Sequence, residues 1–292
     1  ALDLAAGSGR HHRMTDIARI PLAGVIGSPV AHSKSPRLHA HWLKVHGIRG
    51  HYVPMDIGQS DLREVLRALP KAGFVGCNVT IPHKETVLGL ADIVTDRAAL
   101  IGAANTLIFR KDGRIHADNT DGYGFIANLR QNAAGWDPAA GPAAVIGAGG
   151  AARAVVASLI EVGVPEIHIA NRTRARAEAL RAEFGAKLIV HDWVQAGNMM
   201  DGATTVVNTT ALGMEGKPEF RVPLDALSPR AVVTDLVYTP QQTGFLTAAA
   251  AIGCRTVDGL GMLLHQAAPA FERWFGVRPE VDQRTRDVVL GP

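Results

Sequence analysis

The sequence predicts an α/β fold built from two strand-and-helix blocks. Short apolar runs alternate with helical patterns along the chain, which is typical of proteins whose parallel strands are joined by helices. The 292 residues are enough for one large or two ordinary domains, and the hydrophobic share of 47% provides material for a core. A glycine-rich turn near residue 147 follows the first strand of the second of these blocks.

The first block begins with a predicted strand, a polar loop and a helix. Ser35 is a favourable N-cap and Pro36 suits the first helical turn, so we expect a helix to begin there. Leu38, Trp42 and Val45 recur on one face of this helix, which the pattern predicts to be buried. The other elements expected in this block are strands over residues 22–27, 51–55 and 74–79, a helix over 61–69, and a hairpin of 104–109 with 114–117.

The turn that opens the second block reads Gly147-Ala148-Gly149-Gly150-Ala151-Ala152, which fits the pattern G-x-G-x-x-A. Gly147 allows a tight turn, and Gly149 lets the backbone approach a pyrophosphate. A glycine cluster by itself can be an ordinary turn. Here it lies between a strand and a helix, the context that dinucleotide-binding turns require. The strands expected in this block cover residues 143–146, 166–170, 187–190, 205–208, 232–236 and 255–257.

Arginines follow the second strand of this block, where NAD-binding proteins usually have a carboxylate for the ribose 2′-hydroxyl. The run is Asn171-Arg172-Thr173-Arg174-Ala175-Arg176. A guanidinium suits a 2′-phosphate, so Asn171, Arg172, Thr173 and Arg176 are candidates for binding NADP. The alternative is a solvated arginine patch. Cations at a helix start oppose the helix dipole, so an anionic ligand explains them better.

Composition excludes several other classes of protein. The net charge of +3 without a block of consecutive Lys or Arg argues against a nucleic-acid groove. Cys77 and Cys254 lie far apart and form no thiolate metal motif, so we expect no metal and a reducing cytoplasmic location. No apolar run is long enough to cross a bilayer. Residues 1–13 are expected to be a tag or a floppy extension that precedes the true start at Met14.

Polar residues follow the ends of predicted strands in the first block. They are Ser33, Ser35, Thr80, Lys84, Asn105 and Asp121. Each has a simpler role available: a helix cap for Ser35, local backbone bonds for Thr80 and Asn105, solvation for Lys84, and a turn position for Asp121. Together they form a set of hydroxyl, amide, ammonium and carboxylate groups on loops after strands, where α/β proteins bind ligands.

These stretches resemble the shikimate dehydrogenase family. The matching motifs occur in the family's order and are GSPVAHSKSPRLH (27–39), NVTIPHK (78–84), GAANTL (102–107), DNTDG (118–122), GAGGAARA (147–154), NRTRAR (171–176), DLVYTPQQT (235–243) and DGLGMLLHQAA (258–268). The resemblance extends from about residue 20 to about residue 275. It implies a substrate domain over 14–121 completed by 258–292, an NADP-binding Rossmann-like domain over 122–257, and an active-site cleft between them.

The resemblance also implies a reaction, the reversible NADPH-dependent reduction of 3-dehydroshikimate to shikimate in chorismate and aromatic amino acid biosynthesis. Lys84 and Asp121 match the family's catalytic pair, in which Lys84 moves the hydroxyl proton and Asp121 orients Lys84. The carboxylate favours a charged ammonium, whereas burial favours the neutral amine, and the sequence leaves this balance open.

The remaining site residues also follow from the resemblance. Positions expected to bind substrate are Ser33, Ser35, Thr80, Lys84, Asn105, Asp121, Tyr238 and Gln266. Positions expected to bind the cofactor, beside Asn171, Arg172, Thr173 and Arg176, are Gly147, Ala148, Gly149, Gly150, Ala151, Thr209, Val237, Gly259 and Met262. Val237 replaces a methionine that some relatives have near the nicotinamide, so the resemblance does not define which side chains form that wall of the pocket.

Three alternatives compete with this interpretation. A quinate/shikimate dehydrogenase that uses NAD would share the fold and the catalytic pair, but Arg172 and Arg176 favour NADP, and two serines at 33 and 35 favour shikimate. A non-catalytic binding or regulatory homologue would be expected to lack Lys84 or Asp121, and both are present. An unrelated Rossmann protein would need the first block's motifs by chance. A monomer and a homodimer both fit the sequence.

Overall fold

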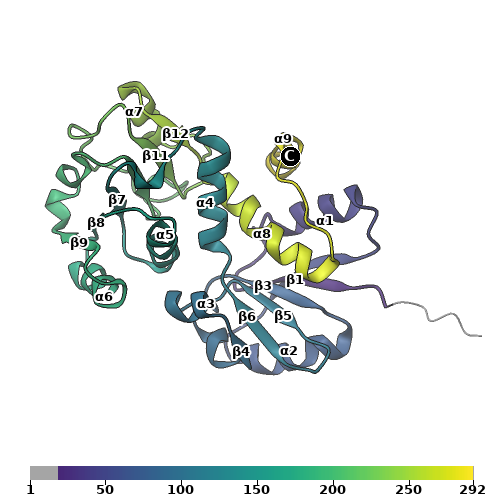
Figure 1. Ribbon diagram of the computed structural model, residues 1–292. Coiled ribbons are helices and arrows are strands. Elements are labelled where there is room, and N and C mark those ends of the chain that lie inside the picture. The colour runs from purple at the N-terminus through teal and green to yellow at the C-terminus, as the bar shows by residue number, and fades with distance from the viewer. Residues whose placement is uncertain (1–18, 292) are drawn as a thin grey trace, which may run out of the picture.

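The computed structural model describes residues 19–291, which form two six-stranded sheets with the helices α4 and α8 between them (Figure 1). The expectation for residues 1–13 concerns positions outside this range. No helix within residues 19–291 is long and apolar enough to cross a membrane.

The first sheet is mixed and has the strand order β2-β1-β3-β5-β6-β4. Its strands are β1 (Leu22–Gly27), β2 (His51–Asp56), β3 (Gly76–Val79), β4 (Ile93–Val94), β5 (Thr106–Phe109) and β6 (Ile115–Asp118). β1 runs parallel to β2 and β3, whereas β5 is antiparallel to both β3 and β6. The predicted hairpin is therefore confirmed. The helices of this half are α1 (Ser35–Val45), α2 (Leu62–Ala68) and α3 (Asp96–Ile101).

The second sheet is parallel throughout and has the order β12-β11-β10-β7-β8-β9. Its strands are β7 (Ala143–Ile146), β8 (Ile167–Ala170), β9 (Leu188–His191), β10 (Thr205–Asn208), β11 (Val232–Asp235) and β12 (Arg255–Val257). All six predicted strands are confirmed to within one residue at each end. Counted from β7, the order reads 6-5-4-1-2-3, the doubly wound arrangement in which ligands bind where the order reverses, between β7 and β10.

Both faces of the parallel sheet are covered, which explains its continuous apolar strands. Alternate residues of β7 enter different cores: Ala143 and Val145 pack on one face, and Ala144 and Ile146 on the other. The helices of this half are α5 (Gly150–Glu161), α6 (Arg174–Phe184) and α7 (Gly244–Ile252).

Two long helices join the halves. They are α4 (Asp121–Asn132) and α8 (Leu260–Phe275), and the short α9 (Gln283–Leu290) follows α8. A Cβ at Gly124 would lie 2.6 Å from the Met262 carbonyl oxygen, and one at Gly261 would lie 1.8 Å from Asn128 Oδ1. The two helices can pack this closely only because glycine stands at these positions.

The structure corrects three details of the sequence analysis. Ser35 is not the N-cap of α1, because Lys34 holds that position and Ser35 is the first helical residue. Val45 is 52% exposed, whereas Leu38 and Trp42 are buried as predicted. In addition, α4 is not among the elements expected from the sequence, since glycines at 122 and 124 have low helix propensity and interrupt the apolar periodicity.

His39 on α1 lies in an aromatic cluster in the core. Its ring is fully buried and stacks on Tyr52 with centroids 3.9 Å apart. Neither ring nitrogen has a hydrogen-bond partner in the part of the chain that the structure describes. Burial lowers the pKa of His39 from 6.5 to about 3. The folded chain therefore keeps this ring neutral at pH values where the unfolded chain protonates it.

This lowered pKa predicts a loss of stability in acid. The stabilising contribution is fully present above pH 6.5 and falls as the pH drops toward about 3. It amounts to about 2 kcal/mol of unfolding free energy between pH 6.5 and pH 5. His39→Phe should remove this part of the pH dependence. Urea unfolding of both proteins at pH 8, 6.5 and 5 measures it, with pH 8 reporting the packing change alone. Equal losses in the two proteins between pH 6.5 and pH 5 would contradict it.

Candidate active site

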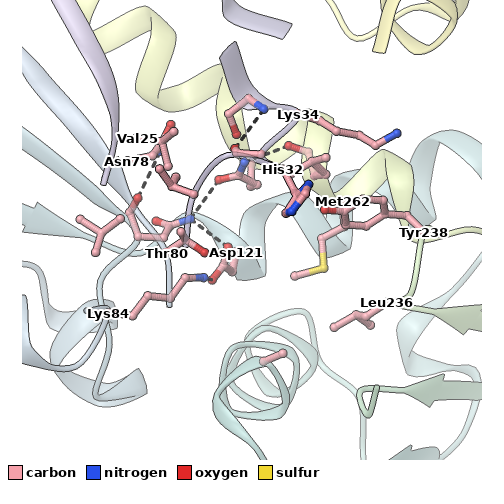
Figure 2. Close-up of a pocket in the computed structure, with 18 of the residues that line it drawn as sticks. Val25, His32, Lys34, Asn78, Thr80, Lys84, Asp121, Leu236, Tyr238 and Met262 are labelled. Carbon is pink, nitrogen blue, oxygen red and sulfur yellow. Dashed lines mark hydrogen bonds and ion pairs between the residues drawn. The ribbon is translucent and has the colours of Figure 1, made fainter. Parts of the chain in front are cut away.

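A cavity of about 430 Å³ lies between the two sheets. All eight residues expected at the substrate line it: Ser33, Ser35, Thr80, Lys84, Asn105, Asp121, Tyr238 and Gln266. Three residues expected at the cofactor, Ala151, Gly259 and Met262, line it as well. Figure 2 shows Lys84 and Asp121 meeting on one side, with Met262, Tyr238 and Leu236 across from them. The fold thus brings together side chains from both ends of the chain.

Lys84 and Asp121 form an ion pair at the edge of this cavity. Lys84 Nζ lies 2.7 Å from Asp121 Oδ2, and the side chains are 32% and 16% exposed. The Lys84 backbone is held because its carbonyl oxygen accepts a hydrogen bond from Ala104 N. Asp121 is not a turn residue but lies in the first turn of α4, where the helix dipole favours a carboxylate.

The amide of Asn105 connects Asp121 to two other elements. Asn105 Nδ2 lies 2.8 Å from Asp121 Oδ1, 2.9 Å from Thr120 Oγ1 and 3.0 Å from Gln266 Oε1. An amide has two N–H protons for these three oxygens. The Thr120 hydroxyl can instead donate to Asn105 Oδ1, 3.1 Å away, so every group in this buried cluster can be paired. Asn105 therefore fixes one carboxylate oxygen of Asp121 and leaves the other to Lys84.

Ser33 and Ser35 lie at the start of α1. The Ser33 hydroxyl accepts a hydrogen bond from the Ser35 backbone N–H at 3.3 Å, and Ser35 makes no side-chain cap. The cap role considered for Ser35 is thus wrong. Ser35 lines the cavity, where its side chain also contacts the buried Tyr52 phenol. Tyr238 reaches the same cavity from the loop after β11, and burial raises the pKa of its phenol above the ordinary value.

Three further polar residues, which are not among those expected from the sequence, line the cavity: His32, Lys34 and Asn78. Asn78 Oδ1 accepts a hydrogen bond from the Tyr52 hydroxyl at 2.7 Å, and its amide donates to the Asn105 carbonyl oxygen at 3.1 Å. An asparagine inside a buried strand is a sequence signal for such a role, because buried amides need partners.

The glycine turn after β7 has the geometry that a dinucleotide phosphate requires. Gly147 has φ +104°, and a Cβ there would lie 2.6 Å from Thr209 Oγ1. A Cβ at Gly149 or Gly150 would meet nothing within 4 Å, so the backbone faces open space. α5 begins at Gly150 without a side-chain cap, which leaves its first N–H groups for an anion. Ala148 N donates to Asn171 Oδ1 at 3.0 Å and ties the turn to the arginine run.

The arginines of that run differ in their partners. Arg174 pairs with Glu178 and Asp192. Arg172 and Arg176 are exposed, and neither makes a side-chain hydrogen bond or ion pair within residues 19–291. Thr173 is the N-cap of α6 but makes no side-chain cap. Two guanidinium groups after β8 therefore have no partner among the described residues and are free to bind a phosphate.

Thr209 and Val237 lie apart from the main cavity. Thr209 donates its hydroxyl to the Ile146 carbonyl oxygen at 2.8 Å, beside Gly147. Val237 is 5% exposed, and its neighbour Leu236 lines the cavity in its place. The Val237 N–H donates to Asp235, a carboxyl whose pKa burial raises to about 6. Within residues 19–291, no three His, Cys, Asp or Glu side chains are grouped to hold a metal.

Comparison with known proteins agrees with this geometry. Family models match three parts of the chain: "Shikimate dehydrogenase substrate binding domain" over residues 25–107, "Shikimate / quinate 5-dehydrogenase" over 133–213, and "Shikimate 5'-dehydrogenase C-terminal domain" over 259–283. The shikimate dehydrogenase (NADP(+)) of Cereibacter sphaeroides is 76% identical over 277 residues, covering 95% of this chain and 99% of the relative.

Solved structures show the same arrangement. Shikimate 5-dehydrogenase from Thermus thermophilus, in complex with NADP(H) and shikimate, has a TM-score of 0.81 and 37% identity, covering 93% of this chain and 97% of that one. Quinate dehydrogenase from Corynebacterium glutamicum, in complex with NAD, has a TM-score of 0.86 and 31% identity, covering 93% and 99%. On this identity and coverage, the chain belongs to the shikimate dehydrogenase family.

Proposed function

We propose that this protein is an NADP-dependent shikimate dehydrogenase, which reversibly reduces 3-dehydroshikimate to shikimate in chorismate and aromatic amino acid biosynthesis. The observation that carries the proposal is the Lys84–Asp121 pair, placed 2.7 Å apart in a cavity lined with hydroxyl and amide groups. The 76% identity with the NADP-dependent relative supports the same activity.

Lys84 is the proton donor and acceptor in this proposal. NADP supplies the hydride acceptor when it is bound. In oxidation Lys84 acts as the neutral amine, whose Nζ takes the proton of the substrate's 3-hydroxyl. In reduction the resulting ammonium returns that proton to the oxygen. Asp121 keeps Nζ in place through Oδ2, while Asn105 keeps the carboxylate from turning by bonding Oδ1.

The remaining cavity residues bind the substrate. Ser33, Ser35 and Tyr238 offer hydroxyl donors to its carboxylate, and the N-terminus of α1 adds a favourable dipole. The ring hydroxyls require groups that donate and accept, and these are Thr80, Asn105, Asp121 and Gln266.

The second sheet carries the residues that would hold the cofactor. The turn of Gly147, Ala148, Gly149, Gly150 and Ala151 would hold its pyrophosphate, and the open approach to this turn supports the assignment. Asn171, Arg172, Thr173 and Arg176 would hold its 2′-phosphate. Thr209, Val237, Gly259 and Met262 follow the rest of its length toward the substrate cavity, which Gly259 and Met262 line.

In this proposal one domain binds the substrate and the other binds NADP. A substrate domain of residues 14–121 is completed by 258–292, and the NADP-binding domain spans 122–257. The separation of the sheets between β6 and β7 supports this division. We place the protein in the cytoplasm as a monomer or homodimer with no nucleic-acid partner. Its two cysteines are both unpaired, as a reducing compartment favours.

The direct test of this function is turnover with two substrates and two cofactors. Shikimate with NADP should give the highest kcat/KM. Quinate with NAD should give a kcat/KM at least a hundredfold lower, because NAD lacks the 2′-phosphate that Arg172 and Arg176 bind in this proposal. NADPH or NADH formation at 340 nm measures all four combinations. Faster turnover of quinate with NAD would support the quinate alternative and overturn the choice.

A second prediction concerns the proton. Lys84→Ala removes the group that moves it, so kcat should fall at least a hundredfold, the usual contribution of a general acid or base. Binding of NADPH, followed by fluorescence, should stay near the wild-type value. Lys71→Ala is the matched control, since Lys71 is an exposed lysine outside the cavity. Wild-type turnover in Lys84→Ala would exclude the assigned role.

A further inference from the structure

A second cavity, of about 320 Å³, lies at the carboxyl ends of the parallel strands. Arg172 after β8, Trp193 and Val194 after β9, and Leu212 after β10 contribute to its walls. The loop between β10 and β11 closes it with Glu219 and Arg221. Because β8 and β10 flank β7, where the strand order reverses, the cavity lies where the far end of a bound dinucleotide would reach.

The lining combines flat apolar surface with positive charge. Trp193 is partly buried against the core, and Val194 is 84% exposed. An apolar side chain left uncovered beside a tryptophan ring suits the face of a planar base. Arg172 lines the same cavity with no partner among the described residues, so a base and a phosphate can both be bound here.

Arg221 lies on the loop between β10 and β11, and its partner is the exposed carboxylate of Glu219. Its guanidinium is within 3.3 Å and 3.2 Å of Glu219 Oε2, through Nε and Nη2. The two side chains are 83% and 79% exposed. Such an exposed ion pair contributes little to stability, because water screens the charges. A phosphate with two negative charges and three acceptor oxygens binds a guanidinium fork more strongly than one carboxylate does.

We propose that Arg221, which lines this cavity together with Arg172, is a further ligand of the cofactor's 2′-phosphate and exchanges Glu219 for it. The inference rests on the proposed use of NADP. It adds Arg221, which lies 45 residues after the end of the Asn171–Arg176 run, to the residues that bind the phosphate. Arg172 and Arg221 then hold the phosphate from two sides, with the base against Trp193 and Val194. Glu219 acts as a competitor that a cofactor without the phosphate cannot displace.

Binding of nucleotide fragments tests this exchange without any need for turnover. Isothermal titration with adenosine 2′,5′-bisphosphate and with adenosine 5′-monophosphate separates the phosphate contact from the base contact. Arg221→Gln should raise the Kd of the bisphosphate about tenfold, the effect of losing one charge-assisted hydrogen bond. It should leave the Kd of the monophosphate unchanged. Glu219→Gln should lower the Kd of the bisphosphate several-fold.

Two further variants complete the design. Arg172→Gln should weaken the bisphosphate in the same way as Arg221→Gln. Arg230→Gln is the matched control, because Arg230 is exposed and lies just before β11, at the amino ends of the parallel strands. It carries the same charge change and should leave both Kd values at wild type, which excludes a general effect of net charge.

The outcomes distinguish this inference from the proposed function. Loss of bisphosphate binding in Arg172→Gln but not in Arg221→Gln overturns the role of Arg221 and leaves NADP use intact. Equal weakening by Arg221→Gln and Arg230→Gln also overturns it. A wild-type protein that binds the two nucleotides equally well contradicts both the inference and the use of NADP.

Discussion

The side-chain amide of Asn105 is the contact on which the arrangement of the site depends. It bonds Asp121 at the start of α4 and Gln266 on α8, while the Asn105 backbone lies between β3 and β6. Because the amide is 3% exposed, its N–H groups depend on these protein oxygens for hydrogen bonds, so the partners are held close to it. The hairpin, α4 and α8 are thereby held in one geometry, and Lys84 meets a carboxylate whose orientation is already set.

The same junction explains how a site forms between two sheets that each have their own core. α4 and α8 approach through Gly124 and Gly261, and no larger residue fits at either position. α4 begins with the carboxylate of Asp121 and leads into the second sheet, while α8 begins beside Gly259 and carries Gln266. The parts proposed to bind substrate and cofactor therefore meet along one helix pair. The chemistry depends on the packing of these two helices as much as on the individual side chains.

The strands of the second sheet could be predicted from sequence because buried parallel strands are continuous apolar runs with glycine turns between them. The hairpin could be predicted for a different reason, because Asp112-Gly113 is a favourable turn between two strands. α4 could not, since its glycines are there for the close approach of α8, which is a tertiary cause. The position of Ser35 within α1 and the exposure of Val45 depend on the neighbouring loop and helix. The candidate residues around the cavity came from motifs, whereas the bonds that Asn78 and Asn105 make needed the fold.

A double-mutant cycle tests most directly whether Lys84 and Asp121 work as a unit. The kcat/KM for shikimate oxidation with NADP would be measured for Lys84→Ala, Asp121→Asn and the two combined. If Asp121 acts by holding Lys84, it has nothing left to hold in Lys84→Ala, so the double variant should be about as active as that single variant. Losses that multiply would show that the two residues act independently and would contradict the account.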